Sequence, residues 1–151
     1  MSIIKTNSIK NSGRFYAEIM DQMQFFFKEY NDHQLHAIIY FNDTLELELL
    51  RGAVLLSIDI VPILGSRFVL NKRCPYWEKI DINNNDIVTF VDSPDPEDDI
   101  RRFIISITDE LVGPQLMIRL IRSSHKDTMC IIMNHMVCDG AGFKEYLYLL
   151  S

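Results

Sequence analysis

The chain has 151 residues, 48% of them hydrophobic and 24% charged, which fits one folded domain and excludes disorder as its main state. A net charge of −6 argues against nucleic-acid binding, because nucleic-acid binders normally present a basic face. No apolar run is long enough to span a membrane, and three cysteines are too sparse for a disulfide framework, so we expect a cytoplasmic protein with reduced thiols.

The first part of the chain predicts a helix and then a strand. Residues 1–12 are polar, and we expect a loose N-terminal segment before a single lobe formed by residues 13–151. From Gly13 onward, apolar residues recur every three or four positions as far as Phe27, which predicts a helix with its apolar face in the core. Its Met and Phe side chains would also suit the lining of an acyl-chain channel. A strand rich in Ile and Tyr is predicted over residues 34–41.

The middle of the chain contains a second predicted helix. Asp43 followed by Glu46 is typical of a capping box and predicts a helix over residues 44–56. Three short strands are then predicted, over residues 67–71, 76–81 and 87–91.

An acidic, proline-containing stretch over residues 92–99 marks the start of another helix. Asp95 can cap it, Pro96 suits its first turn, and acids favour a helix N-terminus, so this interpretation is preferred to an acidic binding surface. The helix should end near residues 106–108.

The last part of the chain predicts an antiparallel hairpin followed by a helix. Two strand-like segments, residues 116–122 and 128–134, are joined by the polar residues 123–127, and a helix is expected over residues 141–151. Together the elements indicate an α+β fold with a mixed, largely antiparallel sheet and packed helices.

The segment after the hairpin carries the clearest chemistry. It places His135, Asp139 and Gly140 between an apolar strand and a helix. A side chain at a strand exit is held rigidly yet reaches open space, and histidine titrates near neutral pH, so His135 is a candidate general base. Asp139 could support the turn through a salt bridge or backbone hydrogen bonds.

These residues form an H-x-x-x-D-G pattern that resembles the signature of the chloramphenicol acetyltransferase-like superfamily, which includes condensation domains and alcohol acetyltransferases. The resemblance implies that His135 is the catalytic base and that Asp139 and Gly140 support the motif structurally. Many members have a second histidine where this chain has Asn134, which would position substrate or simply pack.

A second segment adds to the resemblance. The run from Pro62 to Phe68 resembles the P-x-L-R-T-x-F segment of condensation-type proteins. Gly65 stands where the family often has an arginine that pairs with the motif aspartate. The resemblance leaves two alternatives: Arg67 supplies this pairing to Asp139, or the pairing is absent.

The resemblance covers residues 13–151 and only the N-terminal half of the usual two-lobed protein. It implies acyl transfer from a coenzyme A or carrier-protein thioester to a small alcohol or amine, with His135 as general base and no acyl-enzyme. Acyl-CoA or an acyl-carrier thioester would be the co-substrate, with no bound cofactor. The implied partner is the missing C-terminal lobe or another subunit of a homo-oligomer.

The alternative function is a non-catalytic half-domain, truncated or stand-alone, that binds a partner or acts as a scaffold. An apolar face on the last helix, which needs a cover, favours it. That face comprises Phe143, Leu147 and Leu150.

A metal site is the other alternative for the motif segment. Cys130, His135 and Cys138 have a C-x4-H-x2-C spacing, with Asp139 as a possible fourth ligand. Because alternation along a strand sends Cys130 and His135 to opposite faces and no second cysteine pair exists, we expect no metal. The remaining histidines are expected at the surface or at a rim: His33, His36 and His125.

Overall fold

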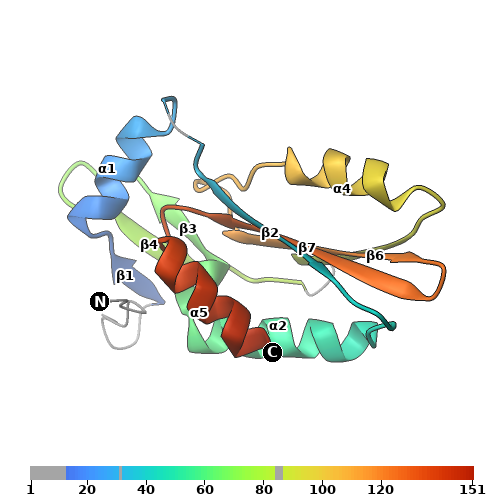
Figure 1. The fold of residues 1–151 in the computed structure, drawn as a ribbon. Coiled ribbons are helices and arrows are strands. Elements are labelled where there is room, and N and C mark those ends of the chain that lie inside the picture. Colours follow the sequence, from blue (N-terminus) through green and yellow to red (C-terminus); the bar gives the residue numbers. More distant parts are fainter. Residues whose placement is uncertain (1–12, 31, 84–86) are drawn as a thin grey trace.

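The computed structural model of the chain describes residues 13–30, 32–83 and 87–151, and it consists of two sheets with helices packed against them (Figure 1). The predicted loose segment, residues 1–12, lies outside the described residues. Within the described residues, no helix is both long and apolar enough to cross a membrane.

The larger sheet has the strand order β2-β7-β6-β5, with β5 parallel to β6 and the other pairs antiparallel. Its strands are β2 (Gln34–Tyr40), β5 (Val88–Asp92), β6 (Leu116–Ser123) and β7 (Lys126–Asn134). The smaller, antiparallel sheet has the order β1-β4-β3. Its strands are β1 (Arg14–Tyr16), β3 (Ser66–Val69) and β4 (Tyr76–Lys79).

The helices cover both faces of the larger sheet and also contact the smaller sheet (Figure 1). They are α1 (Ile19–Phe27), α2 (Leu47–Ile60), α4 (Pro96–Ile104) and α5 (Gly140–Leu150), with a short 3-10 helix, η1 (Pro62–Gly65). Figure 1 shows α4 on one face and α2 with α5 on the other. The α+β class and the largely antiparallel, mixed strand pairing are confirmed, although the strands divide into two sheets.

β7 lies in the middle of the larger sheet and is buried on both faces. Met129, Ile131 and Met133 belong to the core that α2 and α5 cover, whereas Cys130 and Ile132 pack with α4. The alternation of side chains along a strand thus serves two cores at once. Because β2 and β6 pair with β7 on either side, the position of its C-terminal end is closely constrained.

The predicted hairpin is confirmed as β6 and β7. The connection is tighter than expected, because Ser124 and His125 alone form the turn, with φ of 50° and 61°. Positive φ at both central residues matches the right-handed twist of the flanking strands. The polar residues 123 and 126 therefore extend the strand pairing instead of forming a loop.

The expectations for the first helix are wrong in two respects. Residues 14–16 form β1, and α1 begins only at Ile19. Its apolar face is largely exposed: 59% of Met20 and 71% of Phe26 are accessible. The buried residue of α1 is Asp21, whose Oδ2 accepts a hydrogen bond from Nε1 of Trp77 at 3.0 Å. Apolar residues occupy most of the circumference of this helix, so their spacing could not identify the packed side.

The predicted capping box of α2 is also wrong. Glu46 caps the helix, and its carboxylate accepts from the Leu49 N–H at 2.6 Å. The helix begins later than Asp43 suggested because the backbone of Leu45 is engaged elsewhere. Its N–H donates to Asp127 Oδ2 at 2.7 Å and its carbonyl accepts from Arg122 at 2.8 Å. The chain therefore cannot become helical at that residue. By contrast, the predicted cap of α4 is confirmed, with Asp95 accepting from the Asp98 N–H at 3.2 Å.

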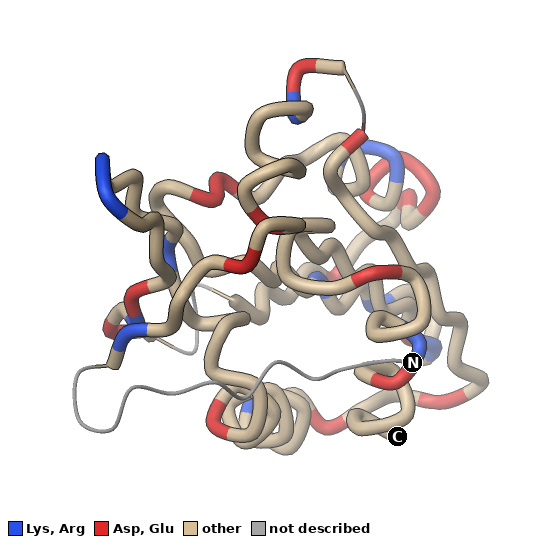
Figure 2. Tube along the Cα trace, turned by 90° about the vertical axis from the view of Figure 1, so that its left-hand side faces the viewer, with Lys and Arg blue, Asp and Glu red and all other residues tan. Residues whose placement is uncertain are grey.

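Charged side chains are interspersed along the chain, without a continuous basic stripe in the view of Figure 2. One charged pair is central to the fold: Asp127 is 1% exposed and accepts two hydrogen bonds from Arg122, each 2.8 Å long. Hydrogen bonding by Arg122, assisted by the Leu45 N–H, holds the pKa of Asp127 below its usual value.

Replacing Asp127 with alanine should lower the free energy of unfolding at pH 7 by about 3 kcal/mol, because Arg122 loses its buried partner. Urea denaturation measures the loss. Since the folded-state pKa is lowered, the stabilisation is present above the unfolded-state pKa and is lost as pH falls through the folded-state pKa. The difference between wild type and Asp127→Ala should therefore shrink on acidification.

The matched control is Asp98→Ala, which removes an exposed ion pair with Arg102. It should change the free energy of unfolding by less than about 0.5 kcal/mol. Equal losses in the two variants would contradict a central role for Asp127.

Candidate functional site

His135 lies in the turn between β7 and α5. Its backbone N–H donates to the carbonyl of His33 at 2.7 Å, so the pairing of β2 with β7 continues one step beyond Asn134. The residue is half-buried. Its Nδ1 is buried and has no hydrogen-bond partner among the described residues. Its Nε2 is not buried in this way. Nε2 is therefore the nitrogen available to an incoming molecule.

Asn134 is 1% exposed and shapes the turn. Its Oδ1 accepts from the Met136 N–H at 2.9 Å, and its own carbonyl accepts from the Val137 N–H at 3.1 Å. These bonds turn the chain out of β7 immediately before His135. The amide nitrogen Nδ2 of Asn134 is buried and has no partner within the described part of the chain.

Asp139 is the N-cap of α5. Its Oδ1 accepts from the Gly142 N–H at 2.8 Å, which satisfies one of the free donors of the first helical turn. A Cβ at Gly142 would lie 3.0 Å from Cβ of Cys138, so the absence of a side chain there allows this close approach. A Cβ at Gly140 would meet no atom within 4 Å, so the packing of the described residues does not require glycine at that position.

Of the two alternatives for the motif aspartate, the structure agrees with the second: Arg67 does not pair with Asp139. Arg67 lies in β3, and its guanidinium binds Glu78 of the adjacent strand at 2.8 Å. The position of the family arginine, Gly65, is closely packed: a Cβ there would lie 2.5 Å from Ile82 and 2.7 Å from Ile58. Arg67 therefore supports the smaller sheet, and the motif aspartate acts in this structure as a helix cap.

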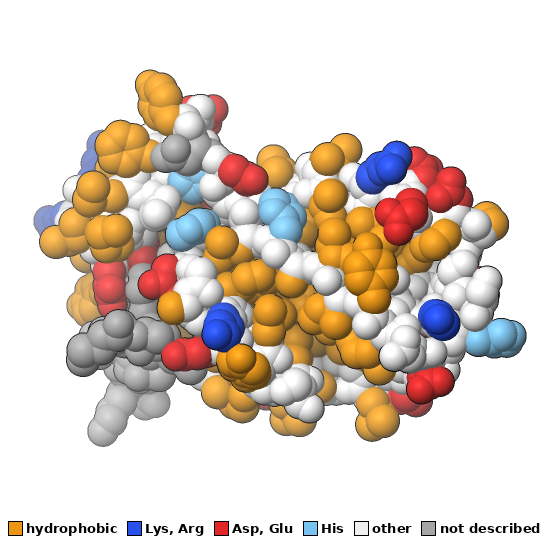
Figure 3. Space-filling model, viewed as in Figure 1, with side chains coloured by type: hydrophobic (Ala, Val, Ile, Leu, Met, Phe, Trp, Pro, Cys, Tyr) orange, Lys and Arg blue, Asp and Glu red, His pale blue; other side chains and the backbone are white. Residues whose placement is uncertain are grey.

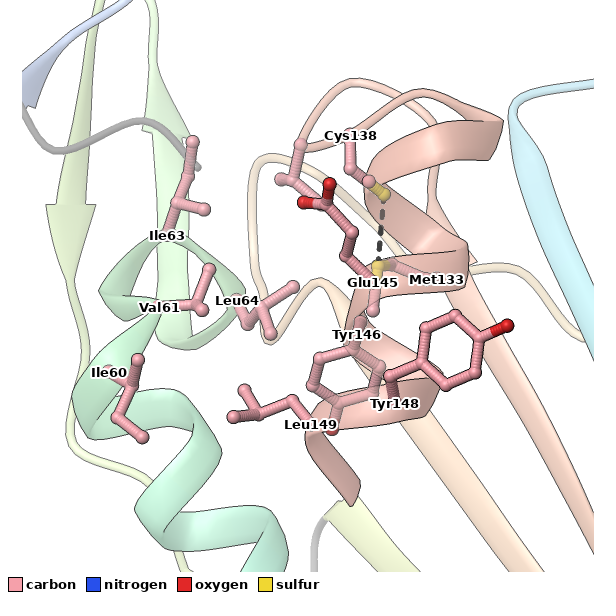
Figure 4. A pocket seen from close by; sticks show the side chains of 12 residues that line it. Ile60, Val61, Ile63, Leu64, Met133, Cys138, Glu145, Tyr146, Tyr148 and Leu149 are labelled. Carbon is pink, nitrogen blue, oxygen red and sulfur yellow. Dashed lines mark hydrogen bonds between the residues drawn. The ribbon is translucent and has the colours of Figure 1, made fainter. Parts of the chain in front are cut away.

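An apolar pocket of about 320 Å³ opens beside the motif turn. Side chains from the end of α2 and η1 face those of α5 across it (Figure 4). Val137, Cys138 and Gly142 of the turn and the first helical residues contribute to its wall, so the pocket adjoins the segment that carries His135. Its charged lining residue is Glu145. A pocket with apolar walls of this size suits a small hydrophobic group.

The cysteines do not gather around His135. Cys130 is fully buried under α4, and burial raises the pKa of its thiol to about 11. Cys138 lies in the motif turn, with Sγ 3.1 Å from Sδ of Met133. Among the described residues, no group of three His, Cys, Asp or Glu side chains is placed to hold a metal ion.

Comparison with known proteins gives a clear result at the level of structure. Neither a protein-family model nor a curated protein matches the sequence. The starter condensation domain of rhizomide synthetase RzmA is 12% identical with a TM-score of 0.73, over 92% of this chain and 38% of that one. The chain has the fold of one part of a condensation domain. At this identity the likeness shows the fold alone, and the fold agrees with the resemblance carried by the H-x-x-x-D-G pattern.

Two further condensation-fold structures are similar. The tallysomycin biosynthesis protein TlmII is 17% identical, with a TM-score of 0.65 over 89% of this chain and 38% of that one. A condensation domain for chain release from the enacyloxin polyketide synthase is 11% identical, with a TM-score of 0.71 over 97% of this chain and 31% of that one. The chain thus spans about a third of the length of these structures.

The structure brings Asn134, His135, Asp139 and Gly140 together in one turn and places Arg67 in the other sheet. Sequence reasoning missed the apolar pocket, because its walls come from two stretches far apart in the sequence, residues 60–64 and 133–149. His33 is half-buried, in agreement with the expected rim position, but the burial of both its ring nitrogens was not foreseen. His36 and His125 are exposed, as expected.

If Asp139 acts as a helix cap, its hydrogen-bond acceptor matters more than its charge. Asp139→Ala should lower the free energy of unfolding by about 1 kcal/mol, whereas Asp139→Asn should stay within about 0.5 kcal/mol of wild type. Thermal or urea unfolding of both variants measures this. A large loss in Asp139→Asn would mean that the charge itself has a partner.

Proposed function

We propose that residues 13–151 form an acyltransferase lobe in which His135 is the general base. In this reaction a thioester donor on coenzyme A or a carrier protein transfers its acyl group to the hydroxyl or amine of a small acceptor. Nε2 of His135 takes the acceptor proton as the acceptor attacks the thioester carbonyl. When the carbon–sulfur bond breaks, the protonated His135 gives this proton to the departing sulfur, which leaves as the thiol. The observation that carries the proposal is the position of His135, at the fixed end of the doubly buried strand β7 and next to an apolar pocket.

The motif turn supports this role in two ways. Nδ1 of His135 is buried and Nε2 is not, so Nε2 is the ring nitrogen that faces outward. The Asp139 cap and the Asn134 turn together define the path of the backbone around His135. A base held in this manner loses little conformational freedom when the acceptor arrives. In this proposal Asp139 and Gly140 support the motif, and Asn134 holds the turn or positions substrate.

The donor is proposed from the pocket and from the neighbours. A variant of the RzmA starter condensation domain binds C8-CoA in its crystal structure, with a TM-score of 0.76 to this chain at 12% identity. In our proposal the apolar pocket takes the hydrocarbon part of the acyl donor. Its walls are side chains of α2, η1, β7 and α5, and they bury apolar surface when an alkyl chain enters.

The second candidate is a non-catalytic half-domain that binds a partner lobe or subunit. The expected uncovered face of the last helix is not present, because Phe143 is buried and Leu147 and Leu150 pack against the core. The apolar side chains that α1 exposes favour this candidate instead, since 76% of Ile19 and 71% of Phe26 are accessible. Figure 3 shows hydrophobic side chains at the surface around α1 as well as over α2 and α5.

The general-base proposal predicts that His135→Ala lowers the rate of thiol release from C8-CoA with an amine or alcohol acceptor by at least about a hundredfold. A thiol-reactive dye measures the rate. His36→Ala, which removes an exposed histidine of β2, is the control and should retain full activity. Equal rates in wild type and His135→Ala would contradict the proposal, and activity in neither would favour the non-catalytic alternative.

The pocket assignment predicts a preference for C8-CoA over acetyl-CoA in kcat/KM. Leu149→Trp narrows the pocket and should reduce this preference at least about tenfold, because several methylene groups lose their buried site. Leu111→Trp is a matched control: Leu111 is 40% exposed against 43% for Leu149 and lies outside the pocket lining. An unchanged preference in Leu149→Trp would show that the alkyl chain binds elsewhere.

A further inference from the structure

His33 lies directly opposite His135 where the pairing of β2 and β7 ends. The strand pairing ends at Gln34 opposite Asn134, and the next bond joins the His135 N–H to the His33 carbonyl at 2.7 Å. Opposite residues of an antiparallel pair direct their side chains to the same face, with Cβ atoms about 5 Å apart. We therefore expect the two imidazole rings to lie next to each other on the same face at this end of the strand pair.

Three ring nitrogens at this position have no hydrogen-bond partner among the described residues. They are both nitrogens of His33 and Nδ1 of His135, and all three are buried. Buried polar atoms without partners are uncommon in native proteins, and each one calls for a physical explanation. A neutral imidazole has one donor and one acceptor, so each of these rings can supply what the other lacks.

Three of the four carboxylates near His33 already have a hydrogen-bond or ion-pair partner. They line a groove that also includes His33. Asp32 accepts from the Gln34 N–H at 3.0 Å, Asp109 accepts from the Leu111 N–H at 2.8 Å, and Glu110 pairs with Lys28 at 2.7 Å. The remaining carboxylate of the groove is Glu29, which is exposed in the turn after α1.

We propose that His33 is a positioning residue for His135, a role that rests on the proposed general-base function. After a rotation of the rings about their side-chain torsions, a nitrogen of His33 accepts the hydrogen on Nδ1 of His135. This contact holds the tautomer in which Nε2 of His135 carries the lone pair that takes the acceptor proton. No group other than the two histidines is needed for it.

The test is the tautomer of His135, read from the nitrogen-15 chemical shifts of its ring at a pH where the ring is neutral. In wild type the Nδ1–H form should predominate. His33→Leu removes the acceptor and should shift the tautomer ratio about fivefold toward Nε2–H, the effect of one ordinary hydrogen bond. His33→Gln keeps an acceptor and should restore most of the ratio. His36→Leu, which changes an exposed histidine of the same strand, should leave it unchanged.

An unchanged ratio in His33→Leu, or a wild type in which the Nε2–H form predominates, would overturn the proposal. Amide spectra report the fold of each variant, and His33→Ala is read in the same way if His33→Leu does not fold. The measurement needs no substrate, so its failure leaves the acyl-transfer proposal intact. Conversely, if the ratio shifts as expected but His135→Ala keeps full activity, the proposed function fails and the contact between the histidines stands.

Discussion

The double burial of β7 is the constraint on which the rest of the structure depends. One set of its side chains packs against α2 and α5 and the other packs under α4, while β2 and β6 take up its backbone hydrogen bonds. A strand held on four sides cannot shift its register without moving every side chain to the wrong core. The backbone position of His135, which follows the strand, is therefore fixed.

The turn after β7 places the candidate site directly at the end of this fixed strand. Asn134 bends the chain through its bond to the Met136 N–H, and Asp139 begins α5 by capping Gly142. Between these two polar anchors lie His135 and the first residues of the pocket wall. The same few residues thus end a strand, start a helix and border an apolar space, which is why a short motif can carry so much of the proposed chemistry.

The sequence correctly predicted those elements whose limits are set by contacts between residues close in the chain. The cap of α4 at Asp95, the hairpin of β6 and β7 and the helix after Asp139 depend on neighbouring residues. The start of α2 and the exposed face of α1 depend on distant partners: the hydrogen bonds of Leu45 to Asp127 and Arg122, and the bond of Asp21 to Trp77. No periodicity within one segment contains that information. The same holds for the pocket and for His33, which tertiary pairing brings to the motif.

Chemical rescue tests most directly whether His135 takes the proton of the acceptor. Imidazole added to His135→Ala can enter the space of the missing ring and act as the base. We predict that thiol release from C8-CoA by this variant rises with the concentration of unprotonated imidazole, while the wild-type rate does not change. A variant that imidazole fails to activate, although it binds C8-CoA as wild type does, would contradict the assignment of His135 as general base.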